Sequence, residues 1–298
     1  MSTGLTERLS LRRRGRELPE RLEALREVVE LGDGRLPAEP LAEARGVLAR
    51  AGERLQLSGE HTVVALAGAT GSGKSSLFNA LTGQELSQVG VRRPTTSQAH
   101  AAVWGPNEAV GPLLAWLGAS RWHAVDAVDG TGARELPGLV LLDLPDHDST
   151  EQAHRLEVDR LVELVDLLVW VVDPQKYADA ALHERYLRPL AGHGAVTVVV
   201  LNQVDRLDPA AAEQCLADLR RLLADDGLAD ARVLPVSART GAGLPELTAL
   251  LADAVRRREA FTDRLSADVT RVVGALAPRV GAEGGEIDDR ERAHLVDA

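Results

Sequence analysis

The sequence contains few of the residues that would place it outside the cell or inside a membrane. It has one cysteine, Cys215, among 298 residues, which excludes a disulfide framework and a cysteine-based metal cluster. No stretch approaches about 18 uninterrupted apolar residues, so we expect neither a membrane-spanning helix nor an exported N-terminus. These absences predict a protein of the reducing cytoplasm, although a longer parent protein could still be associated with a membrane.

Negative charge outweighs positive charge in this sequence, and lysine is rare. The net charge of −11 argues against sequence-specific DNA binding and general nucleic-acid binding, because phosphate backbones select basic surfaces. Arginine provides nearly all of the positive charge, and lysine occurs only at Lys74 and Lys176. The basic cluster 12–16 is either a local basic patch or a solvated helix flank that nearby glutamates offset. A hydrophobic content of 45% is sufficient for a packed core.

Residues 68–75 form a glycine-rich pattern that is suited to holding phosphate. They read Gly-Ala-Thr-Gly-Ser-Gly-Lys-Ser and directly follow the apolar run 62–67, so a strand leads into the loop. Glycine lets the backbone curl until its N–H groups surround phosphate oxygens, and the following helix directs its positive end to the anion. Lys74 can reach the β- and γ-phosphates, and Ser75 can offer its hydroxyl to Mg²⁺. We therefore expect nucleotide contacts from Gly68, Thr70, Gly71, Ser72, Gly73, Lys74, Ser75 and Ser76.

From residue 61 onwards, strand and helix patterns alternate, which predicts a doubly wound α/β fold with a mostly parallel, six-stranded sheet. Apolar runs such as 167–172 lack polar alternation, as expected for parallel strands that are covered on both faces. We predict strands at 62–67, 98–104, 139–143, 167–172, 196–201 and 232–236, and helices at 74–82, 150–165, 179–191, 209–224 and 244–257. Residues 105–137 are expected to add a short helix and strand beside the second strand.

Helical patterns flank this region on both sides. Their apolar stripes are Leu18, Leu22, Leu25 and Val29 before it, and Val269, Val272, Val273 and Leu276 after it. A second helix is expected before the first strand, from about Pro40 to Leu55. We divide the chain into an N-terminal helical arm (1–58), an α/β domain (59–257) and a C-terminal helical segment (258–298). We expect the last segment to be truncated, because no cap ends its final helix.

Polar motifs lie next to several predicted strands, at the edge of the sheet where ligands bind in such folds. In the segment 143–147, the carboxylate of Asp143 is suited to holding a hydrated Mg²⁺ through a water. In the segment 202–205, which reads Asn-Gln-Val-Asp, Asp205 could accept two parallel hydrogen bonds from guanine, whereas adenine offers no matching donors. Two more segments are Ser237-Ala238-Arg239 after the sixth strand and Arg93-Pro94-Thr95-Thr96 before the second.

Together these motifs resemble those of translation-factor-class P-loop GTPases, nearest to the bacterial Era-like and dynamin-like groups. The segments resemble, in chain order, the phosphate loop, the switch threonine, and the D-x-P-G, N-K-x-D and S-A-K elements of that class. The resemblance implies GTP or GDP as ligand, Mg²⁺ as cofactor and hydrolysis of GTP with slow intrinsic turnover. It implies base contacts from Asn202, Gln203, Asp205, Ser237, Ala238 and Arg239, metal contacts from Ser75, Thr96 and Asp143, and catalytic roles for Lys74, Thr96 and His147.

The sequence departs from that class at several positions. Asp146 replaces a glycine whose N–H meets the γ-phosphate, and its carboxylate repels the anion unless it is paired or turned away. Gln203 replaces a lysine whose stem lies over the base. The stem of Gln203 can still do so, but without a charge, so we expect modest guanine affinity. Gly71 replaces the asparagine of potassium-activated relatives, so we expect no potassium activation. His147 either orients the attacking water or is an exposed loop histidine.

Other assignments rest on smaller differences. We favour Thr96 over Thr95 as the Mg²⁺ ligand, since the second threonine takes that role in similar proteins. Residues 92–93, both arginine, either flank a mobile loop or supply charge to the γ-phosphate. We expect structural or surface roles for His100, His123 and His193, because none of these three has a partner at metal-ligand spacing.

Three functions are consistent with these patterns. The first is a Mg²⁺-dependent GTPase that acts as a regulatory switch or self-assembles. The second is a nucleotide-gated interaction module with negligible turnover, whose helical arms are the output and which belongs to a membrane-associated dynamin-like protein. The third is a P-loop ATPase of another class, which Asn202 and Asp205 argue against. The partner is left open between a second copy bound across the nucleotide face, another GTPase, a membrane and a ribosome or its RNA.

Overall fold

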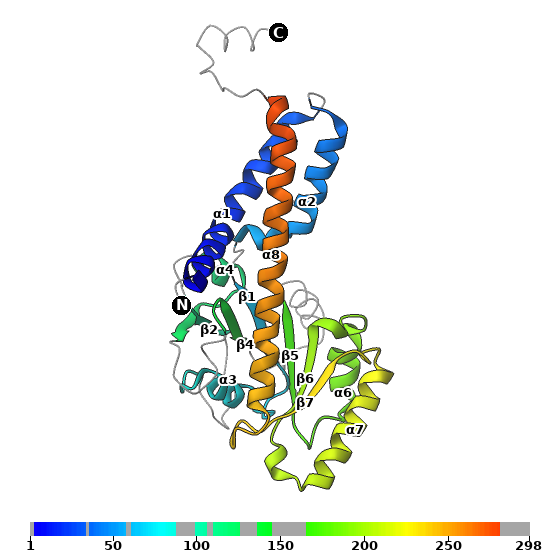
Figure 1. Ribbon diagram of the computed structural model, residues 1–298. Helices are drawn as coiled ribbons and strands as arrows, with labels where there is room; N and C mark the ends of the chain where they lie inside the picture. Colours follow the sequence, from blue (N-terminus) through cyan, green and yellow to red (C-terminus); the bar gives the residue numbers. More distant parts are fainter. Residues whose placement is uncertain are drawn as a thin grey trace. The chain divides into compact units, whose positions relative to one another are not determined.

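The computed structural model describes residues 3–33, 36–57, 61–87, 99–105, 110–125, 136–144 and 165–280. The chain divides into two compact units. One consists of residues 60–260, and the other combines residues 1–59 with residues 261–298. Figure 1 labels most of the helices and strands of both units. We describe each unit by itself.

The α/β unit is built on a seven-stranded sheet with the order β3-β2-β4-β1-β5-β6-β7. The strands are β1 (Thr62–Ala67), β2 (His100–Trp104), β3 (Arg121–Val125), β4 (Leu139–Asp143), β5 (Leu167–Val172), β6 (Thr197–Leu201) and β7 (Arg232–Pro235). Neighbouring strands are parallel except β2 and β4, which are antiparallel. The predicted fold class is confirmed, and the seventh strand is β3, which lies beside β2 as residues 105–137 predicted.

Every residue of the central strands β1, β4, β5 and β6 is buried. Continuous burial explains why these strands read as uninterrupted apolar runs, since helices cover both faces of the sheet (Figure 1). The edge strand β3 is instead exposed at four of its five positions. The carboxyl ends of β1, β5, β6 and β7 share one edge of the sheet, because all four strands run in the same direction.

The helices of this unit agree with the sequence in part. The described helices include α3 (Lys74–Thr82), α4 (Val110–Trp116), α7 (Pro209–Asp225) and α8 (Leu244–Val280). The helix expected at 179–191 is instead irregular: it has one turn of α6 (Ala180–Leu182), then a π-helical and a 3-10 stretch as far as Leu190. The helix expected at 150–165 lies almost entirely outside the described residues. No helix in the described ranges is long and apolar enough to cross a membrane.

The helical unit packs α1 (Thr3–Gly32) and α2 (Ala38–Leu57) with the C-terminal part of α8. The predicted stripe of α1 is buried, and so are Val269, Val272 and Leu276 of α8. Val273, however, is 45% exposed. At 100° per residue it points roughly 70° away from the mean direction of the buried α8 positions, so it was wrongly included in the stripe. The helix expected to end at 257 therefore continues as α8 and supplies part of this core.

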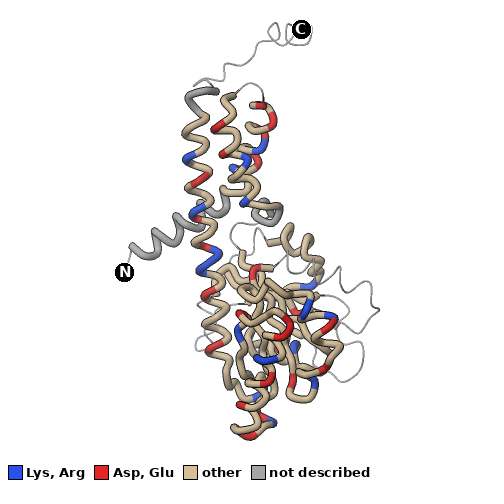
Figure 2. The backbone as a smooth tube through the Cα atoms, turned by 90° about the vertical axis from the view of Figure 1, so that its right-hand side faces the viewer, with Lys and Arg blue, Asp and Glu red and all other residues tan. Residues whose placement is uncertain are grey.

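Charged residues of both signs cover the helical unit, and Figure 2 shows them interspersed along the described helices. Arg50 pairs with Asp268 at 2.9 Å, and Arg271 pairs with Glu43 and Asp268. These side chains are more than a third exposed, so each pair contributes little to stability. The apolar stripes therefore account for most of the packing of this unit.

Candidate functional site

The phosphate loop after β1 depends on two close approaches that only glycine permits. Gly68 has a φ of 145°, and a Cβ there would lie 2.2 Å from the carbonyl oxygen of Val171 in β5. Gly73 has a φ of 89° just before α3, and its Cβ would lie 2.3 Å from Nδ2 of Asn202. A larger residue at either position would displace backbone or the Asn202 side chain. The loop is therefore shaped by β5 and by the residue that follows β6.

Four carbonyl oxygens of the loop accept hydrogen bonds from side chains. The pairs are Lys74 Nζ with Gly68 at 2.7 Å, Lys176 Nζ with Thr70 at 3.0 Å, Gln203 Nε2 with Gly71 at 2.9 Å, and Asn202 Nδ2 with Ser72 at 2.9 Å. In a planar trans peptide, the C=O of one residue and the N–H of the next point in opposite directions. Each of these bonds therefore directs the N–H of the following residue away from the donor side chain. The N–H of Ser72 closes a turn on Ala69 at 3.2 Å. That leaves the N–H groups of Ala69, Gly71 and Gly73 as candidates to bind an anion.

The helix α3 begins inside this loop. Lys74 is its first residue, is buried, and also lies 3.4 Å from the carbonyl oxygen of Ala69. Ser75 and Ser76 follow in the first turn. The positive end of the α3 dipole is therefore next to the loop, which adds to its attraction for phosphate.

On the β4 side of the loop, the hydroxyl of Ser75 donates to Oδ2 of Asp143 at 2.9 Å. Ser87 donates to the same oxygen at 2.7 Å. Asp143 is fully buried, and Oδ1 has no hydrogen-bond partner within the described part of the chain. Burial raises the pKa of this carboxyl above its ordinary value, which the two serine hydroxyls partly oppose.

This set of groups fits Mg²⁺, which prefers oxygen ligands and retains several waters. Asp143 offers an unpartnered carboxylate oxygen, and Ser75 offers a hydroxyl beside it. In the described ranges, no group of three or more histidine, cysteine, aspartate or glutamate side chains could hold a metal. A metal here would therefore depend on hydroxyls and phosphate oxygens as well as on Asp143.

On the β6 side, Asn202 joins the phosphate loop to the segment after β7. Its Nδ2 donates to Ser72, and its Oδ1 accepts a hydrogen bond from the N–H of Ala238 at 3.1 Å. Asn202 is 1% exposed, so both contacts are shielded from water. One amide thereby fixes the loop that would bind phosphate relative to the segment expected to bind a base.

The carboxylate of Asp205 is engaged by its own chain on both oxygens. Ser237 Oγ donates to Oδ1 at 2.5 Å, and Arg239 Nε donates to Oδ2 at 2.9 Å. Hydrogen bonds from Ser237 and then Arg239 hold the pKa of Asp205 below its ordinary value. The side chain of Arg239 is 76% exposed, so solvent can reach its contact with Asp205. A guanine base could therefore replace Arg239 on this carboxylate.

Gln203 is the one non-glycine residue with positive φ among those described, at 63°. This backbone conformation is costly for a residue with a side chain. It accompanies the contact of Nε2 with the carbonyl oxygen of Gly71. Gln203 thus contacts the phosphate loop, whereas the sequence predicted only that its stem would lie over the base.

Several predicted residues lie outside the described part of the chain. They are Arg92, Arg93, Thr95, Thr96, Asp146 and His147. Two residues near the loop were missed: Ser87, a donor to Asp143, and Lys176, a donor to Thr70. Ser87 follows α3 without any motif. Lys176 had a signal, because it is one of only two lysines and it follows an apolar strand.

Comparison with known proteins agrees with this geometry. The family model described as 50S ribosome-binding GTPase matches residues 63–203. The small ribosomal subunit biogenesis GTPase RsgA 1 of Vibrio vulnificus is 36% identical over 106 residues, which is 36% of this chain and 28% of that protein. The protein named probable GTP-binding protein EngB of Rhodopseudomonas palustris is 27% identical over 195 residues, covering 65% of this chain and 81% of that protein.

A solved structure of an oligomerised bacterial dynamin pair shares the fold. It has a TM-score of 0.51 and 12% identity, and the match covers 93% of this chain and 57% of that one. The chain thus spans little more than half of that structure and just over a quarter of RsgA. The family model and the EngB and RsgA matches confirm the resemblance stated from the motifs. The chain contains a P-loop GTPase domain of the type found in EngB and RsgA.

Proposed function

We propose that this chain binds GTP with Mg²⁺ and hydrolyses it to GDP and phosphate, with slow turnover, as a regulatory switch or a self-assembling GTPase. The observation that carries the proposal is the position of Asn202. It bonds both the phosphate loop and the segment that contacts Asp205, so the phosphate and base sites are parts of one site. A nucleoside phosphate matches such a site, and the carboxylate of Asp205 favours guanine over adenine.

In this proposal each group has a defined task. Lys74 and the loop N–H groups hold the phosphates, and Asp205 reads the base. Ser75, Asp143 and Thr96 would hold Mg²⁺, which would neutralise charge on the phosphate oxygens. On the sequence alone, His147 orients the attacking water. Positioning of this kind accounts for much of the catalysis of phosphoryl transfer, because the loose transition state needs alignment more than covalent help.

Equilibrium binding and turnover test the proposal directly. Purified chain should bind a fluorescent GDP analogue, GTP should displace it, and ATP should not. Phosphate release should require Mg²⁺, and Lys74→Ala should abolish binding. Displacement by ATP as effective as displacement by GTP would instead favour a P-loop ATPase.

The nucleotide-gated interaction module is supported by the continuity of α8. This helix begins at Leu244, soon after Arg239, and its residues contribute to the cores of both units. A change at the base segment could therefore be passed along one helix to the arms, or to a second copy bound across the nucleotide face. Measuring turnover over a range of protein concentrations separates the two candidates. Hydrolysis that is readily measured and independent of concentration would contradict the module.

A further inference from the structure

Lys176 lies at the phosphate loop although no motif of the GTPase class includes it. Its Nζ donates to the carbonyl oxygen of Thr70 at 3.0 Å, and it lies 3.9 Å from the position that a Cβ of Gly71 would occupy. The strand β5 precedes Lys176 and pairs in parallel with β1, so the chain leaves the sheet next to the phosphate loop. Both lysines of the sequence therefore donate to carbonyl oxygens of the same loop.

The backbone that carries Lys176 is fixed by the end of β5. Asp173 is 5% exposed, and its Oδ1 accepts the N–H of Gln175 at 2.9 Å. Its carbonyl oxygen accepts the N–H groups of Lys176 and Tyr177 at 3.1 and 3.0 Å. This tight turn positions Lys176 directly after the strand.

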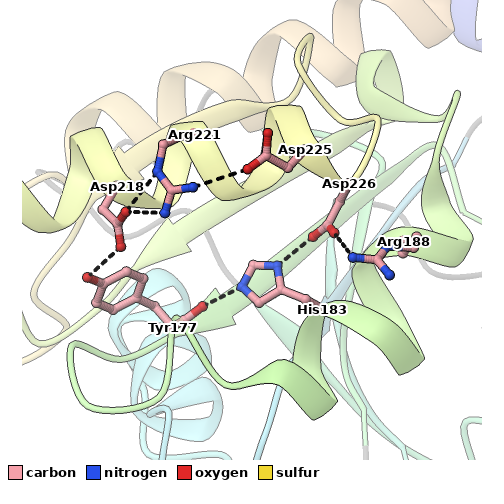
Figure 3. Close-up of polar contacts among 7 residues, drawn as sticks. All are labelled: Tyr177, His183, Arg188, Asp218, Arg221, Asp225 and Asp226. Carbon is pink, nitrogen blue, oxygen red and sulfur yellow. Dashed lines mark hydrogen bonds and ion pairs between the residues drawn. The ribbon is translucent and has the colours of Figure 1, made fainter.

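The next residue, Tyr177, is held at two points (Figure 3). Its carbonyl oxygen contacts Nε2 of His183 at 2.8 Å, and its hydroxyl donates to Asp218 at 3.2 Å. Nδ1 of His183 lies 2.5 Å from Asp226, whose other oxygen accepts from Arg188 at 3.2 Å. His183 and Asp226 are both buried, so this polar cluster can keep the turn in one conformation.

The charge of Lys176 has a specific place in the site. Gln203 binds the adjacent carbonyl, that of Gly71, with an uncharged amide. The N-K-x-D element that residues 202–205 resemble has a lysine at this position. Among the described residues, Lys176 therefore supplies the positive charge next to Thr70 and Gly71, and it follows β5. In the N-K-x-D element, the corresponding charge would come from the lysine that follows β6.

We propose that Lys176 is a second cationic positioning residue of the nucleotide site. It orders the Thr70–Gly71 edge of the phosphate loop and supplies there the positive charge that Gln203 lacks. The proposal rests on the GTP-binding function proposed above. It extends the site to the end of a sixth strand, since the motifs found in the sequence adjoin β1, β2, β4, β6 and β7 but not β5.

Variants of Lys176 test this role through nucleotide affinity. Lys176→Met should weaken GTP binding about tenfold, the effect of losing one charge-assisted hydrogen bond, while Lys176→Arg should retain most of the affinity. The salt dependence of affinity should also decrease in Lys176→Met, which a purely structural role would not cause. Arg220→Met is the matched control, because it removes one exposed positive charge from α7 and should leave GTP affinity unchanged.

A double variant separates charge from folding. Gln203→Lys should restore most of the affinity of Lys176→Met, and it should improve the unchanged chain much less, since the two positions would supply the same charge. Lys176→Met binding like the original chain would overturn the proposal. So would a loss of affinity that comes with a lower melting temperature and that Gln203→Lys does not rescue.

The same measurements distinguish failure of this inference from failure of the proposed function. If the chain binds GTP, Lys74→Ala abolishes binding and Lys176→Met has no effect, the function stands and the inference is wrong. If the chain does not bind guanine nucleotide, or if Lys74→Ala changes nothing, the proposed function itself is wrong and the inference falls with it.

Discussion

Asp143 and Asp205 belong to the same domain, but their surroundings shift their acidities in opposite directions. Asp143 ends β4, is fully buried, and leaves Oδ1 without a partner among the described residues. Asp205 follows β6 and has donors on both oxygens, one of them the arginine of its own base segment. Burial raises the pKa of Asp143, whereas Ser237 and Arg239 lower the pKa of Asp205.

The difference shows how one residue type can serve two ligands. A buried carboxylate with an unpartnered oxygen gains most from a cation, because the cation compensates its lost hydration. A carboxylate that already has donors is ionised before the ligand arrives, and it can exchange one set of N–H donors for another. We therefore expect Asp143 to depend on Mg²⁺ and Asp205 to depend on the identity of the base.

The largest effect is expected from Asp205→Asn. The change should weaken guanine nucleotide binding by about a thousandfold or more, since a site built for specific hydrogen bonds rejects a mismatched partner strongly. Xanthine nucleotide, which carries a carbonyl in place of the amine, should gain affinity. Competition titrations with GTP and XTP measure both changes. Asp208→Asn, in the residue that caps α7 by accepting the N–H of Ala211 at 2.8 Å, is a matched control. Guanine affinity that survived Asp205→Asn would contradict our assignment of the base site.

Asp143→Asn should have the next largest effect and should leave base choice intact. The affinity for Mg²⁺ should fall by about 10- to 100-fold, as for groups that act on a metal through its waters. The nucleotide-free protein should become more stable near neutral pH, because the buried charge disappears. Thermal unfolding without nucleotide reports the stability, and thermal unfolding with GDP, in the presence of Mg²⁺ or of a chelator, reports the Mg²⁺ affinity. Ser87→Ala, which removes only a donor to the same carboxylate, should weaken Mg²⁺ binding less.

The two sites should also respond differently to acid. A raised pKa means that folded Asp143 takes up its proton at higher pH than the unfolded chain does. Protonation of Asp143 therefore stabilises the fold but competes with Mg²⁺. Asp205 behaves in the opposite way, since the stability from its contacts is lost only as the pH falls through its lowered pKa.

As the pH is lowered, GTP affinity should therefore lose its Mg²⁺-dependent part before it loses the preference for GTP over ATP, because the pKa of Asp143 is raised and that of Asp205 is lowered. Histidines also change charge between about pH 8 and pH 5, so a control must separate their effect from that of Asp143. Asp143→Asn serves as the control, because its remaining Mg²⁺ response should not change with pH. If the base preference were lost at a higher pH than the Mg²⁺ response, our comparison of Asp143 with Asp205 would be wrong.

The smallest effect is expected from Arg239→Ala. Removing this exposed partner leaves Oδ2 of Asp205 available to a base, and exposed ion pairs are worth little. Guanine affinity should therefore rise by at most about fivefold. Titration with GDP measures the change. A large loss of affinity would show that Arg239 contacts the nucleotide and does not compete with it.

Much of the fold could be predicted because single elements carried complete local signals. The bounds of β1, α3, β4 and β5 agree with the sequence, since apolar runs and the phosphate-loop glycines mark their ends. The irregular stretch 183–190 could not be predicted, because a π-helical turn is specified by tertiary contacts such as the one between His183 and Asp226. Val273 was misplaced for a similar reason: periodicity gives the direction of a stripe but not its width.

The candidate site was predictable where its residues form contiguous motifs. Segments 68–75 and 202–205 each combine several residue types in an order that chance rarely produces. Ser87 and Lys176 stand alone in the sequence, and their proximity to Asp143 and Thr70 comes from how strands and loops meet.

The sequence by itself determined the presence of a phosphate loop, the parallel sheet and the residues that we propose to read guanine. These properties depend on local backbone freedom, apolar periodicity and the chemistry of single side chains. Only the tertiary structure decided that Asp143 has an oxygen without a partner among the described residues, that Arg239 is bonded to Asp205 and that Lys176 reaches Thr70. The physical reason is that burial, pairing and distance between residues far apart in the chain exist only after the sheet has assembled.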